Sequence, residues 1–280
     1  MKNRLLAYKN SRISYFTYGS GPRLVVCFHG YGEHGRLFQF LGDYAGNEFS
    51  FYALDLPFHG DTQWNEGLNF THTDLQEIIH AILLENNHQL HPDSYRDEKL
   101  RLILLGFSLG GRMALSLYQA WPGAVEKLVL LAPDGLKVNF WYWLATRTWV
   151  GNRLFSFTMK HPGWFLSFLR LMNKFGLVNA SIFKFVNYYI GDKQARLLLY
   201  QRWTSLRRLK PNLSRIKTCI RKNNTRVHLI YGQHDRIILP VRGEHFRKGI
   251  EKYCTLEVIT SGHQVLHAKH ATEIVTSLKS

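Results

Sequence analysis

A serine flanked by glycines carries the chemistry that this sequence predicts most clearly. The segment GFSLGG, residues 106–111, directly follows the apolar run LRLILL at 100–105. A serine hydroxyl can attack a carbonyl carbon when a sharp strand-to-helix turn holds it above the end of a sheet. Glycines two positions before and after the serine leave room for that turn. We therefore predict that Ser108 is a nucleophile that forms a covalent intermediate, with an ordinary turn serine as the alternative.

Such a nucleophile needs a base to accept its proton and an acid to orient the base. His263 follows the strand-like segment LEVIT, and Asp235 follows VHLIY, so we expect both just past the carboxyl ends of strands. The chain order is serine, aspartate, histidine, with spacings of 127 and 28 residues, and this is a known order for such a triad. Asp134 also follows a strand-like segment, LVLLAP, and is the alternative partner for His263.

An acyl-serine mechanism also needs two backbone N–H groups aimed at the developing oxyanion. We predict Leu109, which follows the nucleophile, and Tyr31, which lies in the loop after the apolar run LVVCF. His29 and His34 lie near each other in the sequence, but no carboxylate or thiol cluster accompanies them, so we predict no metal and no cofactor. The residues expected to contact substrate are His29, Gly30, Phe58, Trp141 and Trp143.

Strand-like and helix-like segments alternate around these residues. Runs such as LVVCF at 24–28 are typical of strands buried on both faces. Thr73–Glu85 has apolar residues at helical spacing, with Thr73 as its expected N-cap, and 86–99 reads as a loop. The alternation predicts an α/β fold with a mostly parallel sheet and helices on both faces. The other expected strands are 13–18, 49–54, 100–105, 128–131, 227–231 and 256–259, and the other helices are 36–44, 110–121, 242–251 and 268–278.

The alternation stops after Gly135, where helix-like patterning without a clear strand runs to about residue 210. We therefore expect a core at 1–136, a helical cap or lid at 137–210, and the second part of the core at 211–280. Residues 139–210 contain twelve Lys or Arg and a single acid, Asp192, so eleven of the sixteen net positive charges lie in about a quarter of the chain.

The same stretch holds five of the seven tryptophans. One interpretation is a cap whose aromatic residues form its own core and roof the site, with a solvated basic face. The other is a lid that rests on an anionic membrane or binds an amphipathic acyl chain. Nucleic acid is disfavoured as a partner, because no recognised binding module accompanies the charge.

Composition places the chain among globular proteins, with 45% hydrophobic and 20% charged residues. Its three cysteines are widely spaced and form no CxxC, which argues against a disulfide framework or a zinc ribbon. The N-terminus lacks a secretory apolar region, and no run approaches the roughly 18 apolar residues of a membrane span. We expect a cytoplasmic protein, with peripheral contact at the inner membrane surface as an open alternative.

Taken together, six motifs resemble the α/β-hydrolase superfamily over nearly the whole chain. They are HGYGEHG at 29–35, DLPFHG at 55–60, GFSLGG at 106–111, LAPDG at 131–135, YGQHD at 231–235 and GHQVL at 262–266. The resemblance implies an eight-stranded sheet with a cap inserted after the sixth strand. It also implies Ser108 as nucleophile, His263 as general base, Asp235 as its partner, and Tyr31 and Leu109 as oxyanion donors.

Two positions depart from the superfamily's pattern: Phe58 stands where glycine is common, and His234 lies beside Asp235. The serine argues against epoxide hydrolases and dehalogenases of this fold, which use aspartate as nucleophile. The resulting expectation is hydrolysis of a carboxylic ester with a hydrophobic acyl or aryl group. A thioester, amide or carbon–carbon bond as the target remains an alternative, as does a non-catalytic membrane- or ligand-binding role, because the cap would set the substrate.

Overall fold

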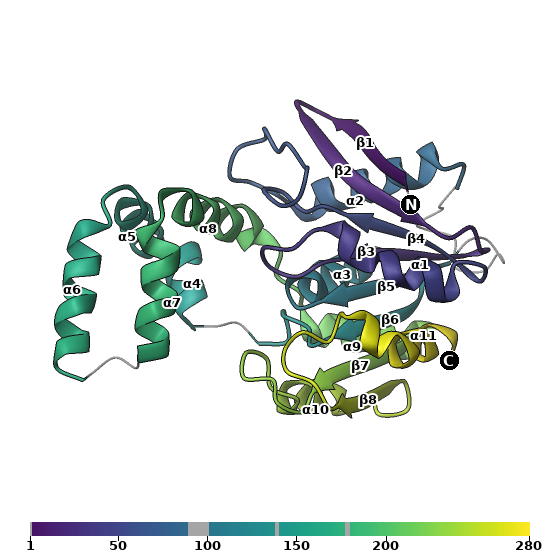
Figure 1. Cartoon of the computed structure of the whole chain (residues 1–280). Helices are drawn as coiled ribbons and strands as arrows, with labels where there is room; N and C mark the ends of the chain where they lie inside the picture. Colours follow the sequence, from purple (N-terminus) through teal and green to yellow (C-terminus); the bar gives the residue numbers. More distant parts are fainter. Residues whose placement is uncertain (1, 89–100, 138–139, 177–179) are drawn as a thin grey trace. The chain divides into compact units, whose positions relative to one another are not determined.

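The computed structural model of the chain describes residues 2–88, 101–137, 140–176 and 180–280, and it divides the chain into two compact units (Figure 1). The first unit comprises residues 1–66, 70–137 and 209–280, and the second comprises 67–69 and 138–208. The predicted loop at 86–99 and the start of the predicted strand at Leu100 lie largely outside the described residues. Each unit is described by itself below.

An eight-stranded sheet forms the centre of the first unit, with the strand order β1-β2-β4-β3-β5-β6-β7-β8 (Figure 1). β2 runs antiparallel to both of its neighbours, and the strands from β4 to β8 are parallel. This confirms the predicted α/β fold with a mostly parallel sheet. The strands are β1 (Lys2–Tyr8), β2 (Ser11–Tyr18), β3 (Arg23–Phe28), β4 (Phe49–Leu54), β5 (Leu102–Phe107), β6 (Val125–Leu131), β7 (Arg226–Gly232) and β8 (Cys254–Ile259).

Helices cover both faces of this sheet. The short 3-10 helix η1 (Gly35–Phe38) precedes α1 (Gln39–Ala45), and η3 (Ala268–His270) precedes α11 (Ala271–Lys279); α1 and α11 pack together on one face. α2 (His72–Glu85), α3 (Leu109–Ala120) and α9 (Leu213–Asn223) pack together on the other, and α10 (Val241–Arg247) packs against β8. Every residue of β5 is buried, as its unbroken apolar sequence predicts for a central strand.

The N-cap of α2 differs from the prediction. Thr71 is the cap: its hydroxyl accepts a hydrogen bond from the Asp74 N–H at 3.2 Å, and the Asp74 carboxylate accepts one from the Thr71 N–H at 2.8 Å. Thr73 lies inside the helix, so its assignment as the cap was wrong. The reciprocal capping box decides the start, because it satisfies two backbone donors that a cap at Thr73 would leave to solvent.

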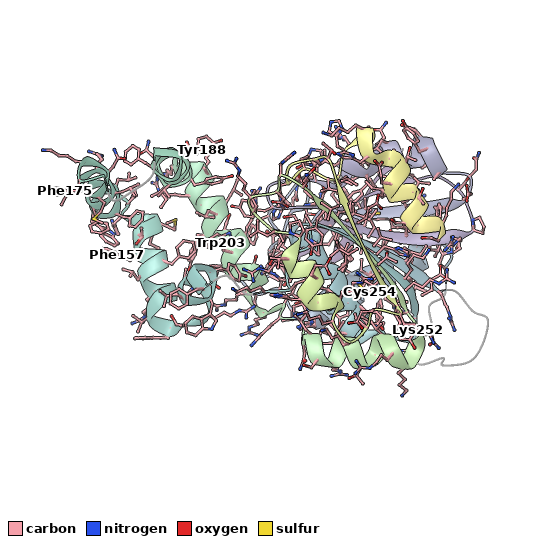
Figure 2. All side chains as sticks on the ribbon, turned by 90° about the horizontal axis from the view of Figure 1, so that it is seen from below. Phe157, Phe175, Tyr188, Trp203, Lys252 and Cys254 are labelled. Carbon is pink, nitrogen blue, oxygen red and sulfur yellow. The ribbon has the colours of Figure 1, made fainter. Side chains whose placement is uncertain are left out.

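Apart from residues 67–69, the second unit follows β6 in the chain and precedes β7. Its described residues form α4 (Phe140–Arg147), α5 (Trp149–Lys160), α6 (Gly163–Lys174), α7 (Ala180–Gly191), α8 (Lys193–Ser205) and the 3-10 turn η2 (Leu206–Arg208). Aromatic rings pack inside it: the Trp203 ring centroid lies 5.3 Å from that of Tyr142 and 5.8 Å from that of Phe155 (Figure 2). These aromatic side chains therefore form a small hydrophobic core within the second unit.

Other large apolar side chains of the second unit are exposed. α6 presents Trp164, Phe168 and Leu171, and its C-cap residue Phe175 follows at the same helical spacing, so the four side chains line one face. Phe157 and Tyr188 are also largely exposed on α5 and α7 (Figure 2). None of the helices in the described ranges has the length and hydropathy to cross a bilayer.

Candidate active site

Ser108 occupies a tight turn between β5 and α3. Its backbone has φ 49° and ψ −115°, a region that non-glycine residues rarely adopt and that costs about 1–3 kcal/mol. Hydrogen bonds hold it there: the Ser108 N–H donates to the carbonyl of Leu131 at 2.9 Å, and its own carbonyl accepts from the N–H groups of Gly111 at 2.9 Å and Asp134 at 2.8 Å. The loop after β6 therefore fixes the turn that carries the serine.

The glycines around Ser108 are required by close backbone contacts. A Cβ on Gly106 would lie 2.5 Å from the carbonyl oxygen of Gly110, and one on Gly110 would lie 1.9 Å from that of Phe28. The additional Gly111 has its own reason, because a Cβ there would lie 2.4 Å from Cβ of Pro133. The motif GFSLGG thus lets α3 start directly against the loops that follow β3 and β6.

A continuous line of hydrogen bonds joins Ser108, His263 and Asp235. Nε2 of His263 lies 2.9 Å from Oγ of Ser108, and Nδ1 lies 2.7 Å from Oδ2 of Asp235. The carboxylate can only accept, so Nδ1 carries the proton and Nε2 is free to accept from the serine hydroxyl. The structure brings the three predicted residues together in the arrangement that nucleophilic attack requires.

Both oxygens of the buried Asp235 carboxylate accept hydrogen bonds. Its second oxygen, Oδ1, accepts from the N–H groups of Ile237 at 2.7 Å and Ile238 at 3.0 Å. Asp134, the alternative partner, instead forms an ion pair with Arg112 and accepts from the N–H of Gly135. The geometry therefore joins Asp235, not Asp134, to His263.

A sequence model of the Alpha/beta hydrolase family matches residues 25–276, which is most of the chain. The chain belongs to this family. Solved structures with the same fold include an esterase from Exiguobacterium antarcticum, with a TM-score of 0.62, 17% identity and complete coverage of both chains. A thermophilic esterase from Thermogutta terrifontis has a TM-score of 0.67 and 15% identity over 100% of this chain and 98% of that one.

Curated relatives match over a shorter stretch. A pimeloyl-[acyl-carrier protein] methyl ester esterase from Nitrosospira multiformis is 28% identical over 150 residues, covering 51% of this chain and 53% of the relative. Lipase LipV from Mycobacterium tuberculosis is 34% identical over 124 residues, covering 43% of this chain and 42% of the lipase. The chain thus spans about half the length of these relatives or less.

The two predicted oxyanion donors belong to different segments, one directly after Ser108 and one in the loop after β3. Leu109 is the first residue of α3, so its N–H has no acceptor within the helix. Tyr31 follows the buried Gly30 in the loop after β3, and its ring meets that of His59 edge-on at 6.0 Å. The contribution of these two N–H groups to an oxyanion hole stays a prediction.

The predicted substrate-contacting residues lie in different surroundings. His29 is fully buried, and its Nε2 accepts the N–H of Leu56 at 3.1 Å while Nδ1 bonds the carbonyl of Gly30 at 2.7 Å, so its ring ties together the loops after β3 and β4. Trp141 lies in α4, but its side chain is outside the described residues. Trp143 is an exposed residue of the second unit. Direct contact of these residues with a substrate stays a prediction.

The departure at Phe58 has a visible backbone consequence. Its φ is 63°, in the left-handed region that glycine occupies at little cost, so this chain holds a bulky residue in a conformation that costs about 1–2 kcal/mol. The nearby Asp55 helps to fix the turn, because its carboxylate accepts the N–H groups of Gly35 at 2.6 Å and Asp61 at 3.0 Å. The motif DLPFHG at 55–60 did not by itself predict this role for Asp55.

Glu33 is a site residue that the sequence reasoning missed. Its carboxylate accepts the N–H of Gly30 at 2.9 Å and also bonds the Gln264 side chain, beside His263. Burial raises the pKa of Glu33, while these hydrogen bonds act in the opposite direction. The position of Glu33 three residues after Gly30 was the one sequence feature that could have indicated this role. The sequence did not show that Gln264 would lie near Glu33.

Within the described residues, no three or more His, Cys, Asp or Glu side chains are grouped in a way that could hold a metal ion. The His29 and His59 rings do lie close, with centroids 5.1 Å apart, but His29 uses both nitrogens on the backbone.

Proposed function

We propose that this protein is a serine hydrolase that cleaves the carboxylic ester of a hydrophobic acyl or aryl substrate through an acyl-serine intermediate. One observation carries the proposal: the unbroken hydrogen-bond line from Ser108 through His263 to Asp235. A serine on a strained turn at the end of a central strand, with a base already in hydrogen-bond contact, is arranged for nucleophilic attack rather than for structural support.

In the proposed mechanism, Nε2 of His263 takes the Ser108 proton as Oγ attacks the ester carbonyl carbon. The developing oxyanion accepts from the N–H groups of Leu109 and Tyr31, and the positive end of α3 favours the same negative charge. His263 then gives the proton to the leaving alcohol, leaving an acyl-serine. Attack by a water that His263 deprotonates releases the acid and restores the serine hydroxyl.

Asp235 acts through His263 in this account. Its buried carboxylate keeps the proton on Nδ1 and stabilises the imidazolium that forms during each step. The two N–H groups on its other oxygen hold the carboxylate in place, so it needs little reorganisation when charge develops.

The relatives support ester chemistry without defining the substrate. One is named a methyl ester esterase and another a lipase, and two neighbours of the same fold are named esterases. We extend ester hydrolysis to this chain on the geometry of its own site. Thioester, amide and carbon–carbon cleavage use the same triad and are the alternatives.

We propose that the helical unit, residues 137–210, is a cap that supplies the apolar part of the substrate pocket, with Trp141 and Trp143 among the contacting side chains. The exposed apolar face formed by Trp164, Phe168 and Leu171 of α6 and by its C-cap residue Phe175 supports an apolar role for this unit. The basic surplus of the same segment favours peripheral contact with an anionic membrane as a second candidate role, in a cytoplasmic protein.

Ester hydrolysis across short to long acyl chains, measured with p-nitrophenyl esters, tests the proposed activity. Ser108→Ala should lower kcat by at least about 10³-fold while leaving the fold intact. Ser116→Ala is the matched control, because Ser116 is a buried serine of α3, the helix that follows Ser108, and lies outside the hydrogen-bonded line. Turnover of acyl-CoA but not of simple esters would favour the thioester alternative. Ester turnover that survives in Ser108→Ala would rule the proposal out.

A further inference from the structure

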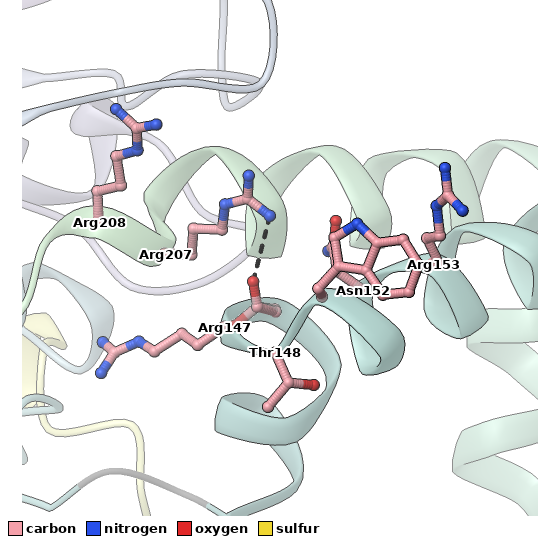
Figure 3. A pocket seen from close by; sticks show the side chains of 8 residues that line it. Arg147, Thr148, Asn152, Arg153, Arg207 and Arg208 are labelled. Carbon is pink, nitrogen blue, oxygen red and sulfur yellow. Dashed lines mark hydrogen bonds between the residues drawn. The ribbon is translucent and has the colours of Figure 1, made fainter.

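The second unit contains a cavity of about 510 Å³ whose lining is strongly basic (Figure 3). It lies where the end of α4, the start of α5 and the turn η2 meet. Four of the eight lining residues are arginines, and the lining as described includes no carboxylate. The lining residues are Thr146, Arg147, Thr148, Trp149, Asn152, Arg153, Arg207 and Arg208. We call this cavity the arginine pocket.

Specific contacts set the positions of three of these arginines. Nη1 of Arg207 donates to the carbonyl of Thr146 at 3.2 Å, the bond drawn in Figure 3. The Arg153 guanidinium lies over the Trp149 ring at 4.4 Å, and that of Arg147 lies 5.9 Å from the Tyr142 ring. These contacts, with two rings and a carbonyl, help to orient the three guanidinium groups.

The segment that forms the arginine pocket is poor in acidic residues. Asp192 is the one acid at 139–210, and its carboxylate caps α8 by accepting the N–H of Ala195 at 2.7 Å. Guanidinium groups around one hollow repel one another, and a repulsive arrangement of this kind is relieved when an anion enters.

The start of α5 adds to the same electrostatic potential. The helix runs for twelve residues from Trp149, and Thr148 caps it by accepting the N–H of Gly151 at 3.0 Å. The positive end of its dipole therefore lies at residues that line the arginine pocket. Helix and arginines favour the same sign of ligand charge.

The ligand chemistry follows from the donors. Guanidinium groups present paired N–H donors that match the oxygens of a phosphate, and several arginines suit a group that offers three oxygens and up to two negative charges. Trp149 is 70% exposed and gives the pocket an apolar wall beside the charged one. This combination fits a phosphate joined to an organic group.

We propose that the arginine pocket binds a phosphate group, borne by a small molecule or by a phospholipid headgroup. The pocket is built entirely from the second unit, and the proposal does not depend on turnover at Ser108. It differs from a merely solvated basic face, because other exposed cations of the unit, such as Arg170 and Lys174, lie outside the cavity.

The test measures binding of three probes by calorimetry and co-sedimentation at about 0.15 M salt, where long-range attraction is screened. The probes are inorganic phosphate, coenzyme A, and vesicles of phosphatidylglycerol mixed with phosphatidylcholine. The pocket variant Arg147→Gln/Arg207→Gln is compared with Arg170→Gln/Lys174→Gln, which removes the same charge from exposed positions outside the pocket. Circular dichroism checks that each variant folds.

We expect the pocket variant to bind at least about tenfold more weakly, since each arginine–phosphate bond is a charge-assisted one. The control variant should keep wild-type affinity. Loss for phosphate and coenzyme A identifies a small-molecule source, and loss for vesicles alone identifies a lipid headgroup. Equal weakening in both variants, or no binding of any probe by wild type, overturns the proposal. If the first variant misfolds, Arg153→Gln/Arg208→Gln, at two exposed positions of the pocket, gives the same comparison.

Discussion

The Asp235 carboxylate bonds Nδ1 of His263 at 2.7 Å, whereas Asp134, which also follows a strand of the sheet, pairs with Arg112. Two aspartates at comparable places in the sequence thus have different partners. The difference assigns them different roles: one orients the base, and the other anchors the loop that fixes the Ser108 carbonyl.

Exchange of each aspartate for asparagine tests this assignment. Asp235→Asn should lower kcat by about 10³- to 10⁴-fold, because an amide can stabilise the wrong tautomer of His263 and no longer balances the imidazolium charge. Asp134→Asn, the matched control, should lose stability through its broken ion pair but only a small part of that activity. Steady-state ester kinetics on both variants provide the comparison. A greater loss in Asp134→Asn would reassign the acid.

Gly110→Ala should strongly destabilise the fold. The added Cβ would lie 1.9 Å from the carbonyl oxygen of Phe28, so backbone must move, at a cost of about 1–3 kcal/mol or more. Gly163→Ala is the control, since a Cβ there meets no atom within 4 Å at the start of α6. Urea unfolding measures both. Equal stability of the two variants would show that the turn tolerates a side chain.

Glu33→Ala should lower kcat by about tenfold with little change in KM, because the loop bearing Tyr31 loses its carboxylate anchor and donates less well in the transition state. Glu33→Gln keeps an oxygen that can accept the Gly30 N–H and should recover most of the rate. Thermal unfolding of both variants separates this effect from a general loss of stability. Equal impairment of the two variants would mean that the charge of Glu33, and not its hydrogen bond, is what matters.

Lys127 should make stability depend on pH. It is 2% exposed, its Nζ donates to the carbonyl of Leu278 at 2.7 Å, and burial, helped by Arg23 and Arg226, lowers its pKa to about 8. Between this pH and about 10.5 the unfolded state holds the lysine proton and the folded state does not, so stability contributed by Lys127 falls as pH falls through this window. As the pH falls from about 10.5 to about 8, the free energy of unfolding should decrease by about 3 kcal/mol on account of Lys127.

Lys127→Met should remove this dependence. As the pH falls from about 10.5 to about 8, wild type should lose about 3 kcal/mol of unfolding free energy that the variant keeps. The variant should therefore gain stability relative to wild type at the lower pH. Lys269→Met, at an exposed position, controls for the loss of a charge. Urea titrations at several pH values give the comparison, and parallel curves for wild type and Lys127→Met would show that the lysine is not desolvated.

Local patterns made the strand-turn-helix around Ser108 predictable. A continuous apolar strand followed by GFSLGG leaves few other conformations, and parallel strands bring the residues after β5, β7 and β8 to one edge of the sheet. His263 could therefore be placed beside Ser108 from the sequence. The predicted strand at 100–105 differs from the observed Leu102–Phe107, because the strand continues through Gly106 to the turn itself.

Tertiary contacts decided what the sequence left open. Asp134 and Asp235 both follow strands, and their different partners depend on Arg112 and His263 arriving from distant segments. Glu33 meets Gln264 across more than 200 residues, which no local pattern encodes. The start of α2 after Thr71 depended on one reciprocal pair of hydrogen bonds. α9 was not predicted, although Pro211 and its N-cap Asn212 separate its short basic sequence from the helical segment before it.

Labelling with a fluorophosphonate serine probe, followed by peptide mapping, tests the central claim most directly. The account predicts a single modified residue, Ser108, in wild type and in Ser116→Ala, and no label in Ser108→Ala. An acyl group trapped from a p-nitrophenyl ester should map to the same serine. An unlabelled but folded wild-type protein, or a label that maps to another residue, would contradict the assignment of Ser108 as the nucleophile.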